Sequence, residues 1–412
     1  MKKLTVLIAL VAMCFAASAQ QMHLQSAISY FNKKYLNKAK TEIDLAVTSD
    51  KNIDSKTWFY KAKIYITVGQ YPTNPNGFKY KGEVPADWRD QAYNAALECK
   101  RLDTDNQWAE QNNALLNILG IEYSNAGIDL YNSGKYQEAF EIFENSIKMF
   151  NASGNSKNSN DSYYLAGLCS VALHDTTSII KNFNTLVRKR TDKDVVYTTL
   201  FNIYKHQNKP EDAFKVANNY VKNCPKEYKA YILLANSYMF NKNMDKAKET
   251  LNSAEALTKD DPTVHATLLC AVGGILADAG EIDAAVEKYN ESLKLYPGQF
   301  EANYGMGTMF YNRGVDKNAA ASAIEPSQDS DFATIDKLTQ ESNENFAKSI
   351  PYFKAAVATI DAMPEGDAKV RQNANLYNCL TALKNAYVRV NNLEELKPIN
   401  ARLAQIEAQQ GK

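Results

Sequence analysis

The sequence predicts an all-α protein, a solenoid of about nine helical hairpins packed one after another. Two observations carry this prediction. Small and apolar residues recur at a spacing of about 34 residues, and recurrence at a fixed offset in one chain indicates a repeat architecture. The residues that mark the second helix of consecutive hairpins are 40, 34, 34 and 38 residues apart, and they are Ala139, Ile179, Ala213, Ala247 and Ala285.

The clearest hairpin lies at residues 269–297. It carries small and large apolar residues, a turn glycine and a terminal proline in this order: Leu269-x2-Val272-Gly273-x2-Leu276, Gly280, Ala285-x3-Tyr289 and Pro297. Small residues let two helices approach closely, large residues fill the gaps between turns, and proline ends the second helix. The pattern resembles the tetratricopeptide repeat (TPR), a pair of antiparallel helices with the signature W-x2-L-G-x2-Y, A-x3-F, P.

Four further copies of this pattern precede that hairpin along the chain. They are Tyr123-x2-Ala126-Gly127 with Ala139-x3-Phe143, Tyr163-x2-Ala166-Gly167 with Ile179-x3-Phe183, Tyr197-x2-Leu200-Phe201 with Ala213-x3-Ala217, and Tyr231-x2-Leu234-Ala235 with Ala247-x3-Leu251. Because each hairpin contacts mainly its neighbours, the resemblance implies a right-handed superhelical solenoid. Its first helices would line the concave face.

The regular TPR-like array occupies residues 114–314, and degenerate copies extend it in both directions. Residues 20–110 predict N-terminal repeats with an insertion at about 66–87, because this stretch is rich in proline, glycine and aromatic residues and cannot be one continuous helix. Residues 315–348 are a second stretch that the repeat spacing does not account for, and we expect either an acidic insertion or an extension of the second helix. Residues 349–412 predict the C-terminal repeats.

Residues 1–19 have the features of a secretory signal peptide. Two lysines precede a short apolar run and then Ala17-Ser18-Ala19, a small-residue cleavage site. We therefore expect an exported protein that begins near Gln20, in the periplasm or associated with the cell envelope. No other stretch reaches the roughly 20 apolar residues of a transmembrane helix. Cys14 raises the alternative of a lipoprotein, which Met13 disfavours because a smaller residue normally precedes a lipidated cysteine.

Charge is balanced over the chain but uneven along it. The chain has 47 basic and 47 acidic residues, and a nucleic-acid-binding domain would normally show a basic excess, so we expect no nucleic-acid partner. Residues 181–229 carry 11 basic and 5 acidic side chains, whereas residues 278–345 carry 5 basic and 13 acidic ones. We expect the acidic region to attract a basic partner, or the basic region of a second copy, in a salt-dependent association.

The sequence offers no motif for catalysis, metal binding or cofactor binding. Its four histidines are isolated from other ligands, and Gly305-Met306-Gly307 lies within a predicted first helix with no strand before it, which argues against a phosphate loop. Five cysteines follow the predicted signal peptide, far apart and odd in number, so they are predicted to pack as small apolar residues. We expect no enzyme activity, no metal site and no cofactor.

The first helices carry the candidate residues for binding a partner. Asparagine amides can hydrogen-bond a peptide backbone in both directions, and tyrosines give amphipathic contact at a low cost in entropy. Aromatic residues at helical spacing also serve as packing between repeats, and this alternative stays open. The predicted groove residues are Tyr131, Asn132, Tyr164, Asn202, Lys205, Asn236, Met239, Phe240, Tyr304 and Tyr311.

Together these features predict a non-catalytic scaffold or adaptor that binds a protein or peptide through its concave face and its insertions. An alternative from a different class is a glycan or nutrient receptor at the cell envelope. Tyr71, Tyr80 and Trp88, at the first insertion, motivate that alternative.

Overall fold

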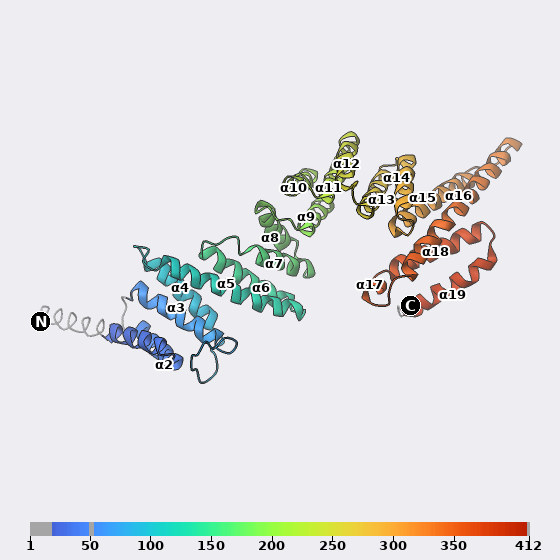
Figure 1. The fold of residues 1–412 in the computed structure, drawn as a ribbon. Helices are drawn as coiled ribbons and strands as arrows, with labels where there is room; N and C mark the ends of the chain where they lie inside the picture. Colours follow the sequence, from blue (N-terminus) through green and yellow to red (C-terminus); the bar gives the residue numbers. More distant parts are fainter. Residues whose placement is uncertain (1–18, 49–52, 410–412) are drawn as a thin grey trace. The chain divides into compact units, whose positions relative to one another are not determined.

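The computed structural model describes residues 19–48 and 53–409, which form helices joined by short turns and one longer loop (Figure 1). Residues 1–18 of the predicted signal peptide, including Cys14, lie outside the described residues. The chain divides into two compact units, Met1–Val196 and Tyr197–Lys412, which we call unit 1 and unit 2.

Unit 1 contains four helical hairpins within its described part. Helical residues 19–32 pair with α2 (Leu36–Thr48), and His23 of the first helix lies 2.7 Å from Glu42 of the second. The other pairs are α3 (Ser55–Gln70) with α4 (Trp88–Leu102), α5 (Ala109–Asn132) with α6 (Tyr136–Ala152), and α7 (Asn160–Ala172) with α8 (Thr176–Arg188).

Unit 2 continues the same arrangement, and α9 (Asp194–His206) begins just before the unit boundary. It pairs with α10 (Pro210–Asn223), as the stacked rings of Tyr197 and Tyr220 show, with centroids 4.2 Å apart. The next pairs are α11 (Tyr228–Phe240) with α12 (Met244–Thr258), α13 (Pro262–Asp278) with α14 (Ile282–Leu295), α15 (Phe300–Ser322) with α16 (Asp329–Asp361), and α18 (Asn373–Arg389) with α19 (Leu393–Gln409). The one-turn helix α17 (Asp367–Val370) precedes α18.

The described residues thus form nine hairpins, and the predicted all-α solenoid of TPR-like repeats is confirmed. Its packing follows the small-to-large logic of the sequence pattern. A methyl group added at Gly127 would lie 2.7 Å from the ring of Phe143, and one at Gly273 would lie 2.9 Å from the ring of Tyr289. The same relation joins Gly167 to Phe183 and Gly307 to Phe353. Each glycine therefore lets an aromatic ring of the second helix seat directly against the first helix.

The short turns within most hairpins share one backbone conformation. The second residue after the first helix has a positive φ of 75° at Gly134 and 80° at Gly280, and non-glycine residues such as His174 adopt the same region. The next amide then donates to a carbonyl five residues back, as Lys135 does to Leu130 at 3.0 Å. This bond satisfies a carbonyl at the helix end and reverses the chain into the second helix.

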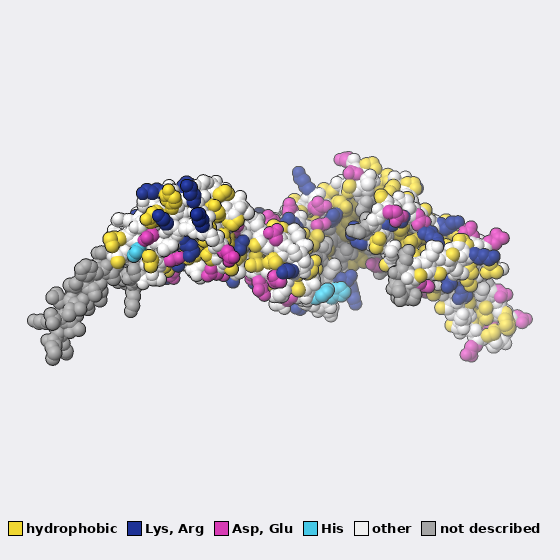
Figure 2. Space-filling view, turned by 90° about the horizontal axis from the view of Figure 1, so that it is seen from below, with side chains coloured by type: hydrophobic (Ala, Val, Ile, Leu, Met, Phe, Trp, Pro, Cys, Tyr) yellow, Lys and Arg dark blue, Asp and Glu magenta, His cyan; other side chains and the backbone are white. Residues whose placement is uncertain are grey.

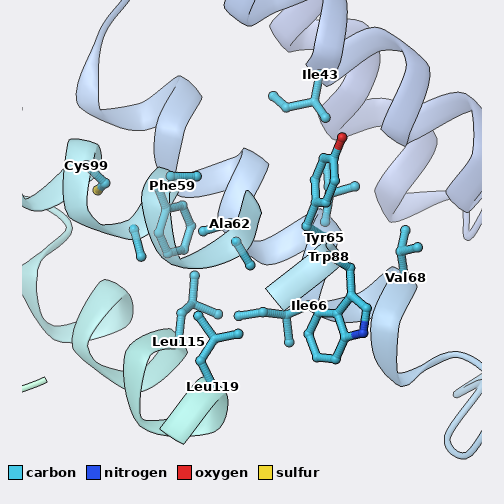
Figure 3. Packing of buried hydrophobic residues seen from close by; sticks show 14 of the residues in the cluster. Ile43, Phe59, Ala62, Tyr65, Ile66, Val68, Trp88, Cys99, Leu115 and Leu119 are labelled. Carbon is cyan, nitrogen blue, oxygen red and sulfur yellow. The ribbon is translucent and has the colours of Figure 1, made fainter. Parts of the chain in front are cut away.

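The core of unit 1 corrects the predicted start of the first insertion. Helix α3 continues through the expected insertion start at residue 66 to Gln70, because Ile66 and Val68 point into the core (Figure 3). Trp88 closes that core by lying against Gly69, which has no side chain to obstruct the indole ring. The non-helical segment is therefore residues 71–87, shorter than the predicted 66–87.

Residues 315–348, the second stretch beyond the repeat spacing, lengthen the hairpin of α15 and α16. Helix α15 runs on to Ser322, and α16 begins at Asp329 and continues through Pro351 to Asp361. The two helices stay packed along this extension, where the ring of Phe346 lies against Gly314 and Ser342 Oγ donates to the Gly314 carbonyl at 2.7 Å. Residues 329–348 therefore extend the second helix, which is one of the two expectations, while residues 315–322 extend the first helix.

The cysteines of the described chain are unpaired in disulfides, as their spacing predicted. Cys99, Cys169, Cys270 and Cys379 are buried, and Cys224 is half-buried. Burial raises the pKa of the Cys99, Cys270 and Cys379 thiols to about 12, because a buried thiolate loses its hydration. These thiols pack as small apolar groups.

Candidate functional site: a groove between two first helices

In each unit the first helices of the hairpins lie next to one another and form one face, which we call the inner side. Successive first helices pack on one another, as α3 does on α5, α5 on α7, α11 on α13 and α13 on α15. Second helices such as α4, α6, α12 and α14 instead pack between their own first helix and that of the next hairpin. The side chains that follow the small packing residue of each first helix are therefore the ones available on the inner side.

In unit 1, the predicted binding residues are divided between packing and exposure. Tyr131 is half-buried, with its ring 5.4 Å from that of Tyr136, and burial raises its pKa. Tyr164 stacks on Phe183 at 6.4 Å. Its other contact is with the ammonium group of Lys193, which lies 4.5 Å from the centre of the Tyr164 ring. Asn132 is exposed at the end of α5. Both tyrosines contribute to packing, which was the open alternative.

In unit 2, the predicted residues on α9 and α11 also differ in exposure. Asn202 and Lys205 are exposed, while Asn236, Met239 and Phe240 are half-buried on α11. Met239 packs against the core that α11 shares with α13. The binding role of these five residues stays a prediction.

The two predicted tyrosines of α15 occupy different surroundings. Tyr311 packs edge-on against Phe346 at 5.1 Å, and its hydroxyl accepts a hydrogen bond from Asn385 Nδ2 at 3.1 Å. It therefore joins α15 to the neighbouring helices. Tyr304 stacks on Phe300, one turn earlier, at 5.7 Å and lines an open groove. Of the ten predicted residues, Tyr304 is the one that this groove brings into a shaped site.

The groove lies between α13 and α15 and has a volume of about 470 Å³, within the range of about 300–1,000 Å³ typical of ligand sites. The aromatic pair Phe300 and Tyr304 forms one side, and Tyr289 of α14 reaches it between the two first helices. Other lining residues are Gly274, Ala277, Asp278, Ile282, Glu301, Gly305, Thr308, Met309, Asn312, Arg313 and Asp316.

The groove is open because α13 presents small residues on its inner side. Gly274 directly follows Gly273, the glycine that packs against Tyr289, and Ala277 lies three residues further along α13. The equivalent positions in other first helices are occupied by larger side chains, namely Ile128 and Tyr131, Leu168 and Val171, Asn202 and Lys205, Asn236 and Met239, and Thr308 and Tyr311. A methyl group at Gly274 would meet nothing closer than the Tyr289 hydroxyl, at 3.6 Å.

Negative charge dominates the groove lining. It contains three carboxylates, Asp278, Glu301 and Asp316, and one guanidinium, that of Arg313. Arg313 is already engaged by Asp283, with nitrogen and oxygen 3.1 Å apart. Glu301 accepts a hydrogen bond from the Gln299 amide at 3.1 Å, which leaves its charge in place. The groove therefore presents an excess of carboxylate charge to whatever enters it.

The hydroxyl of Tyr289 is the most unusual group in the groove. Tyr289 as a whole is only 5% exposed, but its oxygen lies at the groove and is not among the fully buried polar atoms; no other group of the described residues makes a hydrogen bond to it. Burial raises the pKa of Tyr289 to about 12, and the charges of Cys270 and Asp278 act in the same direction. The phenol is therefore protonated at neutral pH and can both donate and accept a hydrogen bond.

Sequence reasoning missed most of this groove. Gly274 and Ala277 contribute because their side chains are absent or small, whereas the predicted binding residues are polar or large. The repeat pattern places Tyr289 at its aromatic packing position, where the ring does pack. The available signal was a tyrosine at a position that Phe143, Phe183 and Phe353 occupy elsewhere, opposite two small residues on the preceding helix.

Comparison with known proteins gives several similarities. A family model described as ChAPs (Chs5p-Arf1p-binding proteins) matches residues 143–273. Among solved structures, the chain is similar to yeast Tom70, with 14% identity, 95% of this chain and 89% of that chain covered, and a TM-score of 0.37. It is also similar to YrrB, described as a TPR protein with an unusual peptide-binding site, with 16% identity, 44% and 89% covered, and a TM-score of 0.34.

A third similar structure is a TPR protein of Thermus thermophilus, with 20% identity, 44% of this chain and 94% of that chain covered, and a TM-score of 0.30. At these identities the likeness concerns the fold alone. Comparison with curated proteins gave no match.

Metal-ligand groups and membrane-spanning helices are absent from the described residues. In residues 19–48 and 53–409, no three histidine, cysteine or acidic side chains are grouped as metal ligands would be. None of the helices within those ranges is both long and apolar enough to cross a membrane. Trp88, which motivated the receptor alternative, is 5% exposed in the core of unit 1 and offers no platform for a sugar ring.

Proposed function

We propose that the protein is a non-catalytic scaffold that binds a partner protein or peptide through the inner surfaces of its TPR-like hairpins. The observation that carries this proposal is the groove between α13 and α15, which combines an open volume with a tyrosine hydroxyl that has no hydrogen-bond partner among the described residues. A shaped and polar inner surface is what a peptide-binding face requires.

Site-specific photo-crosslinking in the native cell tests this proposal. A photoreactive residue is placed at an inner position, Asn132, Asn202 or Thr308, and in matched proteins at an exposed outer position, Gln137 or Glu287. The scaffold proposal predicts discrete adducts from inner positions and few from outer ones. Equal adduct patterns from the two sets, or none from either, would remove it.

The protein is further proposed to act after export, in the periplasm or at the cell envelope. The lysine pair, short apolar run and Ala17-Ser18-Ala19 at the N-terminus support this placement. Fractionation of cells that make the full chain tests it, together with the N-terminal sequence of the purified protein. A mature N-terminus near Gln20 in the periplasmic fraction is expected, and an uncleaved cytoplasmic chain would contradict export.

Self-association is a second proposed interaction, supported by the uneven charge of the chain. Residues 181–229 carry a formal charge of +6 and residues 278–345 carry −8. Contact between these regions of two copies would be screened by salt, so association should weaken markedly above about 0.3 M ionic strength. Light scattering across a salt series measures this, and association that does not respond to salt would refute it.

A further inference from the structure

We propose that the groove between α13 and α15 binds a lysine or arginine side chain of a basic peptide segment from the partner protein. This inference rests on the proposed scaffold function and specifies the chemistry of the partner at one site. Three features carry it: the spare hydroxyl of Tyr289, the open floor formed by glycines, and the excess of carboxylates at the rim.

The hydroxyl of Tyr289 is not explained by packing. The ring fills the aromatic position of the repeat, against Gly273 and Gly305. In three other hairpins that position is filled by Phe143, Phe183 and Phe353, which pack on a glycine of the preceding helix without any hydroxyl. Because the Tyr289 oxygen lies at the groove and has no hydrogen-bond partner among the described residues, it is available to a group that enters the groove.

The open floor lets a long side chain reach that hydroxyl. Gly274 and Gly305 flank Tyr289 from the two first helices, and a methyl group at Gly305 would lie 2.6 Å from the Tyr289 oxygen. A side chain at either position would cover the phenol. With both absent, the hydroxyl is accessible from the groove, and the volume of about 470 Å³ accommodates a side chain with part of its backbone.

The charge of the groove selects a cation. Asp278, Glu301 and Asp316 outnumber the single guanidinium of Arg313, which Asp283 already pairs. Lysine and arginine have donors and no acceptor, so they match both the carboxylates and the oxygen of a protonated phenol. The aliphatic part of such a side chain would lie along the rings of Phe300 and Tyr304, where a cation gains additional attraction.

Peptide binding to the purified mature chain tests this inference. The probes are a ten-residue peptide that alternates lysine with glycine and its counterpart with glutamate in place of lysine, both measured by calorimetry. The lysine peptide should bind and the glutamate peptide should not. Failure of the lysine peptide to bind the wild-type chain would overturn the inference.

Variants locate the binding site. Tyr289→Phe removes one oxygen and keeps the ring, and it should weaken the lysine peptide about tenfold, the size of one hydrogen bond to a charged group. Asp278→Asn should weaken it by a similar factor. Glu287→Gln changes the charge equally on the exposed face of α14, outside the groove, and is the matched control. Equal affinity for Tyr289→Phe, Asp278→Asn and wild type would place the peptide elsewhere and overturn the inference.

A third variant tests whether a loss of peptide binding could result from a loss of folding. Gly274→Leu fills the groove from a half-exposed helix position where no backbone obstructs a side chain. It should abolish peptide binding while the melting temperature stays at or above that of wild type, because glycine is unfavourable within a helix. Retained binding in this variant would also overturn the inference.

Parallel photo-crosslinking in cells separates this inference from the scaffold proposal. If adducts persist unchanged in Tyr289→Phe and Asp278→Asn while peptide binding is also unchanged, the groove inference fails and the scaffold stands. If the groove variants instead abolish self-association and leave the lysine peptide unaffected, the occupant is a second copy of the chain and the inference of a separate basic partner fails.

Discussion

The hairpin α5/α6 and the hairpin α13/α14 use the same packing and present different inner surfaces. In both, a glycine of the first helix receives an aromatic ring, Gly127 with Phe143 and Gly273 with Tyr289. In both, a serine three residues after that ring donates to a carbonyl of the first helix at 2.7 Å, Ser146 to Gly120 and Ser292 to Ala266. The buried side of the repeat is therefore nearly identical.

The inner side of these two hairpins differs at every equivalent position. Helix α5 presents Ile128, Tyr131 and Asn132, of which Ile128 is 37% exposed, where α13 presents Gly274, Ala277 and Asp278. The larger residues cover the inner side of α5, and the smaller ones open a groove on α13. The packing within a hairpin and its inner surface are therefore set by separate residues, so the inner surface can change while the hairpin stays folded.

Adding a methyl group should affect the two faces in opposite ways. Gly127→Ala puts Cβ 2.7 Å from the Phe143 ring, and this overpacking should lower the free energy of unfolding by about 1–3 kcal/mol. Gly274→Ala meets nothing closer than 3.6 Å and should raise it by about 0.5–1 kcal/mol, because alanine favours the helix. Urea denaturation measures both, and destabilisation of equal size would show that the inner face also contributes to packing.

A hydroxyl should be costly in one hairpin and neutral in the other. Phe143 is fully buried, and Ile128 and Tyr131 stand where α13 has Gly274 and Ala277, so Phe143→Tyr should bury an oxygen. We expect a loss of about 1–3 kcal/mol, the cost of an unsatisfied buried polar group. Thermal unfolding of this variant gives the cost, and a melting temperature equal to that of wild type would contradict the claim that α5/α6 has less room for a hydroxyl than α13/α14.

The stability lost on replacing Ser146 or Ser292 should follow the number of hydrogen bonds that each hydroxyl makes. Ser146 Oγ bonds the Gly120 carbonyl and also lies 2.8 Å from Ser162 Oγ of α7, whereas Ser292 Oγ has the Ala266 carbonyl alone as its partner among the described residues. Ser292→Ala should cost about 1 kcal/mol and Ser146→Ala somewhat more, because it leaves two partners unsatisfied. The urea midpoints of the two variants measure which loss is larger. A larger loss for Ser292→Ala than for Ser146→Ala would contradict the view that the two serines have equivalent places in their hairpins.

Alkaline pH should destabilise α13/α14 through its own titrating groups. Burial raises the pKa of Tyr289 and of Cys270 to about 12, so the fold favours the neutral forms. Their contribution is complete below the ordinary values of about 9 for the thiol and 10 for the phenol, and it is lost as pH rises towards 12. Melting temperatures from pH 8 to 11.5 should fall less steeply for Tyr289→Phe than for wild type, and parallel curves would contradict this.

The sequence was sufficient to predict what depends on contact between neighbouring hairpins. The pairing of Gly127 with Phe143 and of Gly273 with Tyr289 follows from a small residue and a large one at a fixed offset. The extent of α3 was not predictable from composition, because burial of Ile66 and Val68 in the core outweighed the helix-breaking residues that follow them.

The groove was not predictable for a different physical reason. A groove is a volume left empty, and Gly274 and Ala277 show no property in sequence that distinguishes an open surface from close packing. Predicted binding residues such as Tyr131 and Tyr311 instead meet other side chains, Tyr136 and Phe346, which only the arrangement of adjacent helices determines.

The most direct test of the central claim, that packing and recognition are separate in α13/α14, is a paired measurement on Tyr289→Phe. The melting temperature and the affinity for the lysine–glycine peptide are determined on the same preparation. The account predicts a melting temperature within about 2 °C of wild type, since the lost oxygen has no partner, together with an affinity about tenfold weaker. A lowered melting temperature with unchanged affinity would contradict it, because the hydroxyl would then serve the fold.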